Sequence, residues 1–441
     1  MPMRVEPLSR PGHHAPLQAL SSLASLPRVS RSAGALVTSL VVLSGCSGRA
    51  GAPSAWTVTR DTLPSGAVRV TNTPPTGSPA PDRVLEENLR IGTREGQGPA
   101  QFGAIMGLAV LSDGRIAVLD GQAKQVRLFD RTGAYLESFG GEGQGPGELE
   151  VGWGLMRDRR DRLWVPDYRN ARMSVFDPDS GFLRSFPMKI SSYGYFWSGA
   201  MLADGRIVKL ALVPSGFVLR VYGRDMNQVD SALLAKLPPE PANPGDSPNS
   251  FVWTAPDRSR AVYITVPFYP LTRRAFGPSG DVWSSPPAGD PSYRITRGSL
   301  DGDTAVVLET KRPPMPVSPA ERDSAIRSIR AQFADYSAHV DLDWSKIPRV
   351  RPAISGMFVS ESGQLWVRTP ASGATVRFDV YGRDGSHLRA VETSLAIAPQ
   401  PPPIVRGDTL WAVVKDALGV QYVVRGTIRA AGGMPRAAGG T

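Results

Sequence analysis

The amino-acid sequence predicts an all-β protein, a six-bladed β-propeller in which an N-terminal strand closes the last blade and one helix is inserted. The first observation behind this prediction is a strand motif, preceded by a tight turn, that recurs six times along the chain. The second is the composition, because 46 Gly and 41 Pro among 441 residues indicate frequent turns, which suit many short strands. The third is the content of 9 Trp, 11 Tyr and 14 Phe, which need a large core.

The repeat is clearest in two neighbouring stretches of the chain. Ile116–Asp120 and Gln125–Asp130 match Leu163–Asp167 and Arg172–Asp177, which lie 47 residues further on. A period of 40–50 residues made of strands and tight turns is typical of propellers. The motif strand begins at Ile116, Leu163, Ile207, Val282, Leu365 and Leu410.

Each repeat is expected to form one four-stranded blade. In the first full repeat the strands are predicted at Gly107–Leu111, Arg115–Asp120, Gln125–Asp130 and Tyr135–Phe139. Side chains alternate between the two faces of a strand, so one blade presents apolar residues on both faces. A single blade cannot bury both faces, and the blades must therefore pack against one another in a ring.

The last repeat has no obvious fourth strand. It starts at Leu410 and ends after Tyr422–Ile428. Val84–Ile91, ahead of the first full blade, is expected to supply the missing strand and so hide both sheet edges. Trp56–Arg60 and Ala67–Asn72 have the pattern of a hairpin that packs outside the ring.

Two repeats carry insertions, and one insertion is expected to be helical. Ser318 is a suitable N-cap, Pro319 suits the first helical position and Glu321 completes a capping box, so Ser318–Val340 is predicted to be a helix. This helix either packs on the rim of the ring or acts as a lid or docking element. Pro238–Pro256, rich in Pro, Asn and Ser, is expected to be an exposed loop. One face of the helix carries Ile326, Ile329, Phe333 and Tyr336.

The N-terminal segment has the pattern of a secretion signal. An apolar run of eleven residues, 33–43, follows Arg28 and Arg31 and ends in Leu43-Ser44-Gly45-Cys46. Eleven residues are too few to span the roughly 30 Å of bilayer hydrocarbon as a helix. The four final residues resemble the bacterial lipobox, and this resemblance implies cleavage before Cys46, lipidation of its thiol and an extracytoplasmic, membrane-anchored protein. By the same resemblance, Ser47 after the cysteine suggests the outer membrane.

These features divide the chain into several parts. The predicted parts are a signal peptide (1–45), an anchor, linker and accessory hairpin (46–83), the propeller (84–430) with its helical insertion (318–340), and a flexible tail (431–441).

The strand pattern also carries a family resemblance. Asn170–Asp177 resembles NHL-repeat propellers, and the chain over 84–430 is similar to bacterial six-bladed propeller lipoproteins. The resemblance is strong in the first two blades and weak in the fourth. It implies a fold and export, and it implies little about activity.

No catalytic set is visible in the sequence. Of four histidines, only His339 and His387 lie beyond the signal region, so a zinc site with three His ligands cannot be built, and both are expected at the surface. No phosphate-binding loop with its lysine and no nucleophile elbow is present. Repeated aspartates at strand ends could hold Ca²⁺, although turn capping explains them more simply. These aspartates are Asp120, Asp130, Asp167 and Asp177.

The net charge of +10 comes mostly from scattered arginines without a Lys/Arg run, which predicts a solvated basic surface and no nucleic-acid partner. The favoured function is a module that binds a ligand or a protein. Its partner would be the membrane through the lipid, and an envelope protein, a peptide or a saccharide. The alternatives are a metal-dependent, gluconolactonase-like hydrolase and an envelope assembly or scaffold protein. No cofactor is expected apart from the Ca²⁺ considered above.

Four large side chains in or near inter-strand loops are candidates for binding a ligand. The aromatic stretch Ser191–Gly199 suits either packing between blades or a wall at the channel mouth that stacks on a sugar or peptide. The four candidates are Trp153, Tyr168, Arg169 and Trp197.

Overall fold

The computed structural model describes residues 56–75, 81–96, 98–188, 197–213, 216–235, 247–255, 261–287, 292–334 and 342–431. Over these residues the protein is all-β, apart from helix α1 (Pro319–Ala334) and a short 3₁₀ turn, η2 (Trp344–Lys346). The predicted signal peptide, Cys46 and the tail from residue 432 lie outside the described residues. Among the described helices, none has the length and apolar character needed to cross a membrane.

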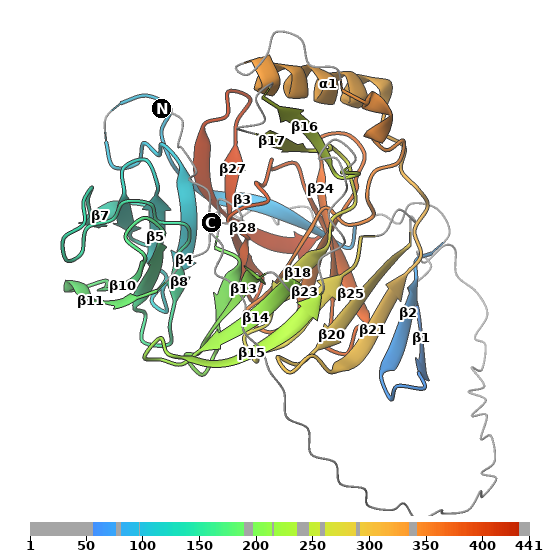
Figure 1. Ribbon diagram of the computed structural model, residues 1–441, viewed down its shortest axis with the longest axis horizontal. Coiled ribbons are helices and arrows are strands. Elements are labelled where there is room, and N and C mark those ends of the chain that lie inside the picture. The colour runs from blue at the N-terminus through green and yellow to red at the C-terminus, as the bar shows by residue number, and fades with distance from the viewer. Residues whose placement is uncertain are drawn as a thin grey trace, which may run out of the picture. The chain divides into compact units, whose positions relative to one another are not determined.

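The described strands of the ring fall into six antiparallel units of four strands, here called units 1 to 6. Two further strands extend the sheet of unit 4, and units 5 and 6 join edge to edge in one eight-stranded sheet. Figure 1 shows how the labelled strands are arranged. Unit 1 contains β4 (Ile105–Val110), β5 (Ile116–Asp120), β6 (Gln125–Phe129) and β7 (Tyr135–Gly140). Unit 2 contains β8 (Met156–Arg157), β9 (Leu163–Asp167), β10 (Arg172–Asp177) and β11 (Gly181–Pro187). Unit 3 contains β12 (Gly199–Met201), β13 (Ile207–Val213), β14 (Gly216–Tyr222) and β15 (Gln228–Ala235).

The second half of the ring repeats this order. Unit 4 contains β18 (Arg273–Phe276), β19 (Val282–Ser285), β20 (Tyr293–Gly298) and β21 (Thr304–Thr310). Unit 5 contains β22 (Gly356–Val359), β23 (Leu365–Thr369), β24 (Val376–Tyr381) and β25 (His387–Thr393). Unit 6 contains β26 (Ile404–Arg406), β27 (Thr409–Lys415), β28 (Gln421–Ala430) and, as its fourth strand, β3 (Arg83–Ile91). The second strand of every unit begins within one residue of its predicted position.

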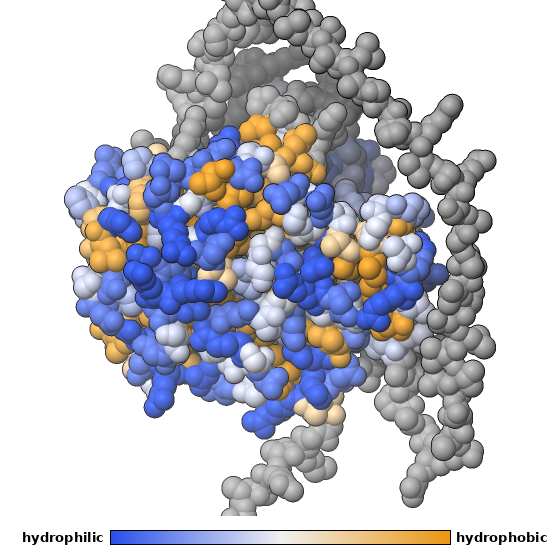
Figure 2. Space-filling view, turned by 90° about the horizontal axis from the view of Figure 1, so that it is seen from below, coloured by the Kyte–Doolittle hydropathy of each residue, from blue (hydrophilic) through white to orange (hydrophobic). Residues whose placement is uncertain are grey.

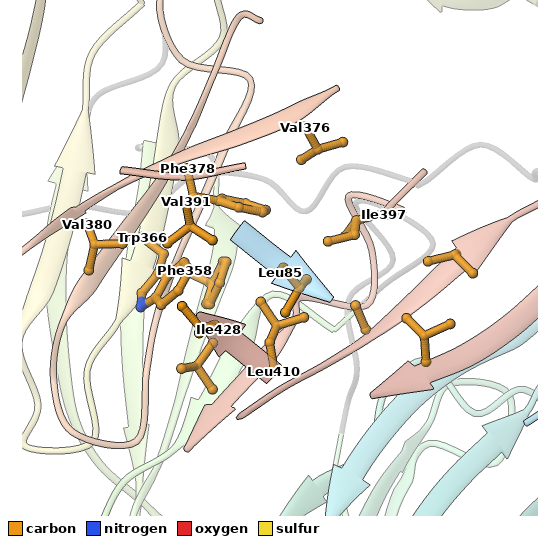
Figure 3. Close-up of a cluster of buried hydrophobic side chains, with 14 residues drawn as sticks. Leu85, Phe358, Trp366, Val376, Phe378, Val380, Val391, Ile397, Leu410 and Ile428 are labelled. Atoms are coloured by element: carbon orange, nitrogen blue, oxygen red, sulfur yellow. The ribbon is translucent and has the colours of Figure 1, made fainter. Parts of the chain in front are cut away.

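Hydrophobic clusters join each unit to the next. Separate buried clusters lie between units 1 and 2, 2 and 3, 3 and 4, 4 and 5, and 5 and 6, and a further cluster joins unit 6 back to unit 1. Figure 3 shows the cluster between units 5 and 6, where Phe358 and Trp366 pack with Leu85 of β3 and Leu410 of β27. Both faces of each unit are thus buried, and the all-β propeller fold predicted from the repeat is confirmed.

Strand β3 closes the ring, as the sequence predicts. It pairs antiparallel with β28, from Ile91 opposite Val423 to Arg83 opposite Ala430. Its inward residue Leu85 joins the cluster between units 5 and 6, whereas Ile91 joins the cluster between units 6 and 1. One strand therefore contributes to both interfaces of the last unit.

An N-terminal hairpin covers the outer edge of unit 4. Strands β1 (Thr57–Thr62) and β2 (Val68–Thr73) pair with each other, and β2 then adds in parallel to β21. The side chain of Asn72, which is fully buried, donates to the Gly385 carbonyl and accepts from the His387 backbone N–H. The hairpin is thereby tied to unit 5 as well.

The two insertions pack on each other. The first contains strands β16 (Ser250–Thr254) and β17 (Ala261–Thr265), and their apolar residues meet α1 of the second insertion (Figure 1). The expectation of an exposed loop over Pro238–Pro256 is therefore wrong for its last part, because Phe251 is buried against Ile329 and Phe333. A helix face supplies the partner that the local sequence does not reveal.

Helix α1 begins with the predicted capping box. The Ser318 backbone N–H donates to Glu321 Oε2 at 3.0 Å, and the Glu321 N–H donates back to Ser318 Oγ at 3.3 Å. Hydrogen bonds from Arg351 and Ser318 lower the pKa of Glu321 to about 2. Residues 335–341, including the predicted face residue Tyr336, lie outside the described part of the chain.

Both insertions leave the ring at the same end. Four antiparallel strands return the chain to the end where each unit begins, so every connection from a fourth strand to the next first strand lies at that end. The insertions at 236–272 and 311–355 are two such connections, and this end is called the insertion end below. The face that Figure 2 shows, seen from below Figure 1, is predominantly hydrophilic with smaller apolar groups.

Candidate functional site

The ring encloses a central cavity of about 900 Å³. The first strands of all six units contribute to its wall, because the first strand of each unit faces the ring axis. The lining segments are Met106–Val110, Trp153–Arg159, Trp197–Ala203, Thr272–Phe276, Ser355–Val359 and Pro399–Val405, with Leu210, Pro278, Glu361, Arg368, Phe378, Ile397 and Ala398.

The carboxylates of the described lining residues lie away from the insertion end. Asp158 and Glu361 both follow the first strand of their unit, so they sit where those strands finish. Asp158 accepts from Trp164 Nε1 at 3.1 Å and pairs with Arg162 at 2.6 Å. Its oxygens are thus already engaged by neighbours within unit 2.

Glu361 is engaged in the same way. Its carboxylate pairs with Arg406 at 2.8 Å and with Arg157 at 3.3 Å. Burial acts to raise the pKa of Glu361, but the hydrogen bonds from Arg406 and Arg157 outweigh it and lower that pKa. The negative charges of this end are therefore neutralised by arginines of units 2 and 6.

The insertion end of the cavity carries three arginines. Arg273 and Arg274 open strand β18, directly after the first insertion. Arg368 lies on β23 opposite Gly356 of β22, and because Gly356 has no side chain, Arg368 borders the cavity beside a first strand. Different units thus bring these guanidinium groups to one end of the same cavity.

None of these three arginines has a carboxylate partner among the described residues. The Nε of Arg273 is buried and makes no hydrogen bond there. Arg274 lies over the Phe217 ring at 5.5 Å, and Arg368 donates to the Ile397 carbonyl at 2.8 Å. Burial lowers the pKa of all three guanidinium groups, which means that the charged form loses hydration without gaining an ionic partner.

Two tryptophans form an aromatic part of the wall at this end. Trp153 stacks on Tyr168 with ring centroids 4.3 Å apart and nearly parallel planes. The backbone N–H of Trp197 donates to the backbone carbonyl of Trp153 at 2.6 Å. A Cβ atom added to Gly154 would lie 2.6 Å from the Cβ of Trp197. Glycine at 154 therefore allows the close approach of the two aromatic segments.

Lys209 adds a further cation next to this wall. Its Nζ lies 5.4 Å from the centre of the Trp197 ring. Burial lowers the pKa of Lys209 to about 8. The aromatic wall therefore has a cation beside the Trp197 ring.

The structure separates the four residues proposed from the sequence. Trp153 and Trp197 line the cavity. Tyr168 supports Trp153 from behind, and Arg169 is exposed and does not line the cavity. The sequence does not predict that Arg273, Arg274 and Arg368 line a site. The local signal that points to two of them is the Arg-Arg pair at the start of a strand that follows an insertion. Of the aromatic stretch Ser191–Gly199, residues 191–196 lie outside the described residues.

The repeated aspartates act as acceptors for backbone N–H groups. Asp120 accepts from Gly103, Ala104, Gln122 and Ala123. The other three, Asp130, Asp167 and Asp177, likewise accept from nearby backbone N–H groups.

These hydrogen bonds favour the turn-capping interpretation of the aspartates over Ca²⁺ ligation. Within the described ranges, no three His, Cys, Asp or Glu side chains come close enough together to hold a metal ion.

His387 corrects another expectation. It was expected at the surface, but its ring stacks on Trp56 with centroids 3.7 Å apart and meets the Tyr381 ring edge-on. The reason is the N-terminal hairpin, which brings Trp56 over the start of β25. His339 lies outside the described residues.

The chain is similar in structure to several solved proteins of low sequence identity. No protein-family model matches the chain, and no curated protein matches its sequence. A Bacteroides fragilis protein described as exported is 12% identical, with 82% of this chain and 99% of that chain covered and a TM-score of 0.45. A virginiamycin B lyase from Staphylococcus aureus, solved with quinupristin, is 11% identical (85% and 99% covered, TM-score 0.38). A gluconolactonase from Xanthomonas campestris is 14% identical (80% and 99% covered, TM-score 0.33). At these levels the comparisons assign neither a family nor an activity to the chain.

Proposed function

We propose that this chain is an extracytoplasmic propeller, anchored by a lipid on Cys46, that binds a small ligand in its central cavity. The observation that carries the proposal is the cavity itself, whose volume of about 900 Å³ lies in the range of small-molecule sites. Its wall joins apolar strand residues with two tryptophans and a few polar groups. That combination is typical of sites that bind a ligand and fix its orientation.

The lipobox resemblance and the NHL-like repeat support the export and the anchor. A ring that faces the envelope space on a lipid tether could meet ligands there. The carboxylates at the cavity are already paired with arginines, so the structure gives no specific support to the gluconolactonase-like alternative. Binding is therefore the function that the arrangement favours.

A variant that fills the cavity tests the proposal. A Cβ on Gly356 would meet only Arg368 Cβ, at an ordinary contact distance of 3.9 Å, so a larger side chain fits the strand and occupies the cavity. Small-molecule fragments, charged and neutral, are added to the full chain carrying Cys46→Ser, and binding is detected by ligand-observed NMR. Fragments that bind are expected to lose their signal when Gly356→Phe is added.

The matched control is Gly98→Phe, at an exposed position outside the cavity lining where an added Cβ would meet no atom within 4 Å, and it is expected to leave fragment binding unchanged. Equal binding to the Gly356→Phe protein would show that the fragments occupy another place. The absence of binding by any fragment would contradict a ligand-binding cavity. Circular dichroism of each variant establishes that the ring is folded before binding is compared.

A further inference from the structure

The two ends of the cavity differ in how their charges are paired, and the proposed function does not by itself explain this difference. At one end Arg157, Arg406 and Glu361 form a network of paired charges. At the insertion end, the lining residues Arg273 and Arg368 have no described carboxylate beside them. The insertion end therefore carries buried positive charge without an ionic partner, whereas the lining Arg159 at the other end is exposed to solvent.

Partly buried arginines elsewhere in the ring have hydrogen-bond acceptors for at least some of their nitrogens. Arg172 donates to the backbone carbonyls of Gln144, Gly145 and Glu148. Arg127 of unit 1 donates to the carbonyls of Pro99 and Gln101 and lies 3.3 Å from Asp120. The Nε of Arg172 is, like that of Arg273, buried without a hydrogen bond, but Arg273 differs in that none of its nitrogens makes a hydrogen bond to a described residue.

An uncompensated charge that has lost hydration costs free energy. A bound anion would offset this cost. The planar guanidinium fork matches the two oxygens of a carboxylate or of a phosphate group, and this pairing is among the strongest hydrogen-bonded pairs in proteins.

We infer that the ligand of the central cavity is a small organic anion, with its carboxylate or phosphate group held by Arg273 and Arg368 and its organic part against Trp153 and Trp197. The inference rests on the proposed function and adds the chemical class of the ligand. Arg274, whose guanidinium lies over the Phe217 ring, adds positive charge to this end of the cavity without being assigned a contact with the anion.

A second, smaller hollow shares part of its lining with the central cavity and is also lined by basic side chains. It measures about 380 Å³ and shares Arg368 and the segment Ile397–Pro399 with the cavity. Its remaining lining includes Lys415, so a second cation lines this hollow together with Arg368.

Matched pairs of probes test the inference on the full chain carrying Cys46→Ser. The probes are indole-3-acetate against indole-3-acetamide, and phenyl phosphate against phenol, measured by isothermal titration calorimetry. Each anion is expected to bind about tenfold or more tightly than its neutral partner, because charge-assisted hydrogen bonds are formed only with the anion. The tighter of the two anions distinguishes a carboxylate from a phosphate ligand.

Arginine variants locate the anion. Arg273→Gln and Arg368→Gln are each expected to weaken anion binding about tenfold and to leave the neutral probes unchanged. The control is Arg169→Gln, an exposed arginine outside the cavity lining, which removes the same charge and is expected to change anion affinity less than about twofold.

A stability measurement separates a binding role from a structural one. Without ligand, Arg273→Gln is expected to raise the melting temperature by roughly 1–3 °C, because it removes a charge without an ionic partner. A fall in both melting temperature and anion affinity would assign Arg273 a structural role and overturn the inference.

The remaining outcomes judge the two proposals separately. Equal affinity for the anion and its neutral partner overturns the inference and leaves the proposed function standing. An equal loss of anion affinity in Arg169→Gln also overturns it, because a general surface charge would then explain the preference. The proposed function is judged on its own by fragment binding to the wild-type and Gly356→Phe proteins.

Discussion

At the residue scale, His387 lies between the N-terminal hairpin and unit 5. Its ring is stacked on Trp56, its Nε2 is buried without a hydrogen bond among the described residues, and its backbone N–H is held by Asn72. Burial lowers the pKa of His387 to about 4, although Asp379 acts in the opposite direction. The folded protein therefore keeps this imidazole neutral at pH values where the unfolded chain protonates it.

This difference predicts a loss of stability in mild acid. Because the folded pKa lies below the unfolded value of about 6.5, the contribution of His387 is complete above that pH and is lost as the pH falls toward 4. The shift corresponds to at most about 3 kcal/mol. His387→Phe, which keeps an aromatic ring on Trp56, is expected to reduce the fall in unfolding free energy between pH 7 and pH 4.5, measured by chemical denaturation.

His339→Phe, which changes the other histidine downstream of Cys46, is the control for this measurement. An identical pH dependence in the wild-type and His387→Phe proteins would show that the ring is not protonated on unfolding in this range. A smaller fall in His387→Phe alone would assign that part of the acid sensitivity to this one side chain.

Single residues also mark the limit of what the sequence predicts. The aspartates at strand ends repeat with the units, so their role in turns could be predicted from a local pattern. Arg273 and Arg368 lie in different units and repeat nowhere. Their importance depends on the register of β18 and β23 and on the absence of an acceptor nearby. Such an absence is a property of three-dimensional packing, and no local pattern encodes it.

At the element scale, β3 contributes to two interfaces of the ring. Leu85 and Ile91 are 6% and 3% exposed and belong to different inter-unit clusters. Replacing Leu85 by Ala is expected to lower the unfolding free energy by about 2–4 kcal/mol, since it leaves a cavity in a packed core. The free energy is measured by chemical denaturation.

The matched control is Glu86→Ala on the same strand, whose side chain is exposed and forms only a surface ion pair with Arg429. Its expected effect is below about 1 kcal/mol. A Leu85→Ala protein as stable as the wild type would mean that the ring does not depend on this strand for its closure.

Strand elements were predictable because their signals are local. Turn residues and alternating apolar residues specify the second and third strands of each unit, and the lack of a fourth strand after Tyr422–Ile428 pointed to β3. The strand at Ser250–Thr254 was missed for the opposite reason. Its neighbours in sequence are Pro- and Asn-rich, and its burial comes from α1, which follows much later in the chain.

At the scale of the whole molecule, the lipid anchor remains a prediction. The chain contains one cysteine, so a single substitution removes every thiol. Cys46→Ser is expected to abolish labelling by an alkyne-bearing fatty acid and to move the protein from the membrane fraction to the soluble fraction. Several acyl chains give stable anchoring, and their loss leaves no comparable attachment.

Ser47→Ala serves as the control, because it leaves the thiol in place and is expected to keep the label. Labelling that persists in Cys46→Ser would mean that the fatty acid is attached elsewhere. Membrane association that persists without the label would assign the attachment to a protein partner.

The pairing of β3 with β28 also determines when the ring can be completed during synthesis of the chain. Arg83 pairs with Ala430, so the first strand of the ring to be synthesised meets its antiparallel partner only when the last one emerges, although Arg83 and Val84 also pair in parallel with β25. Until then Leu85 and Ile91 have no completed interface to enter, and the unpaired edge of β3 is free to pair with another chain. Units 1 to 5 can form one after another as the chain lengthens. The finished ring appears only in a final step, which a chain cut short before β28 can never take.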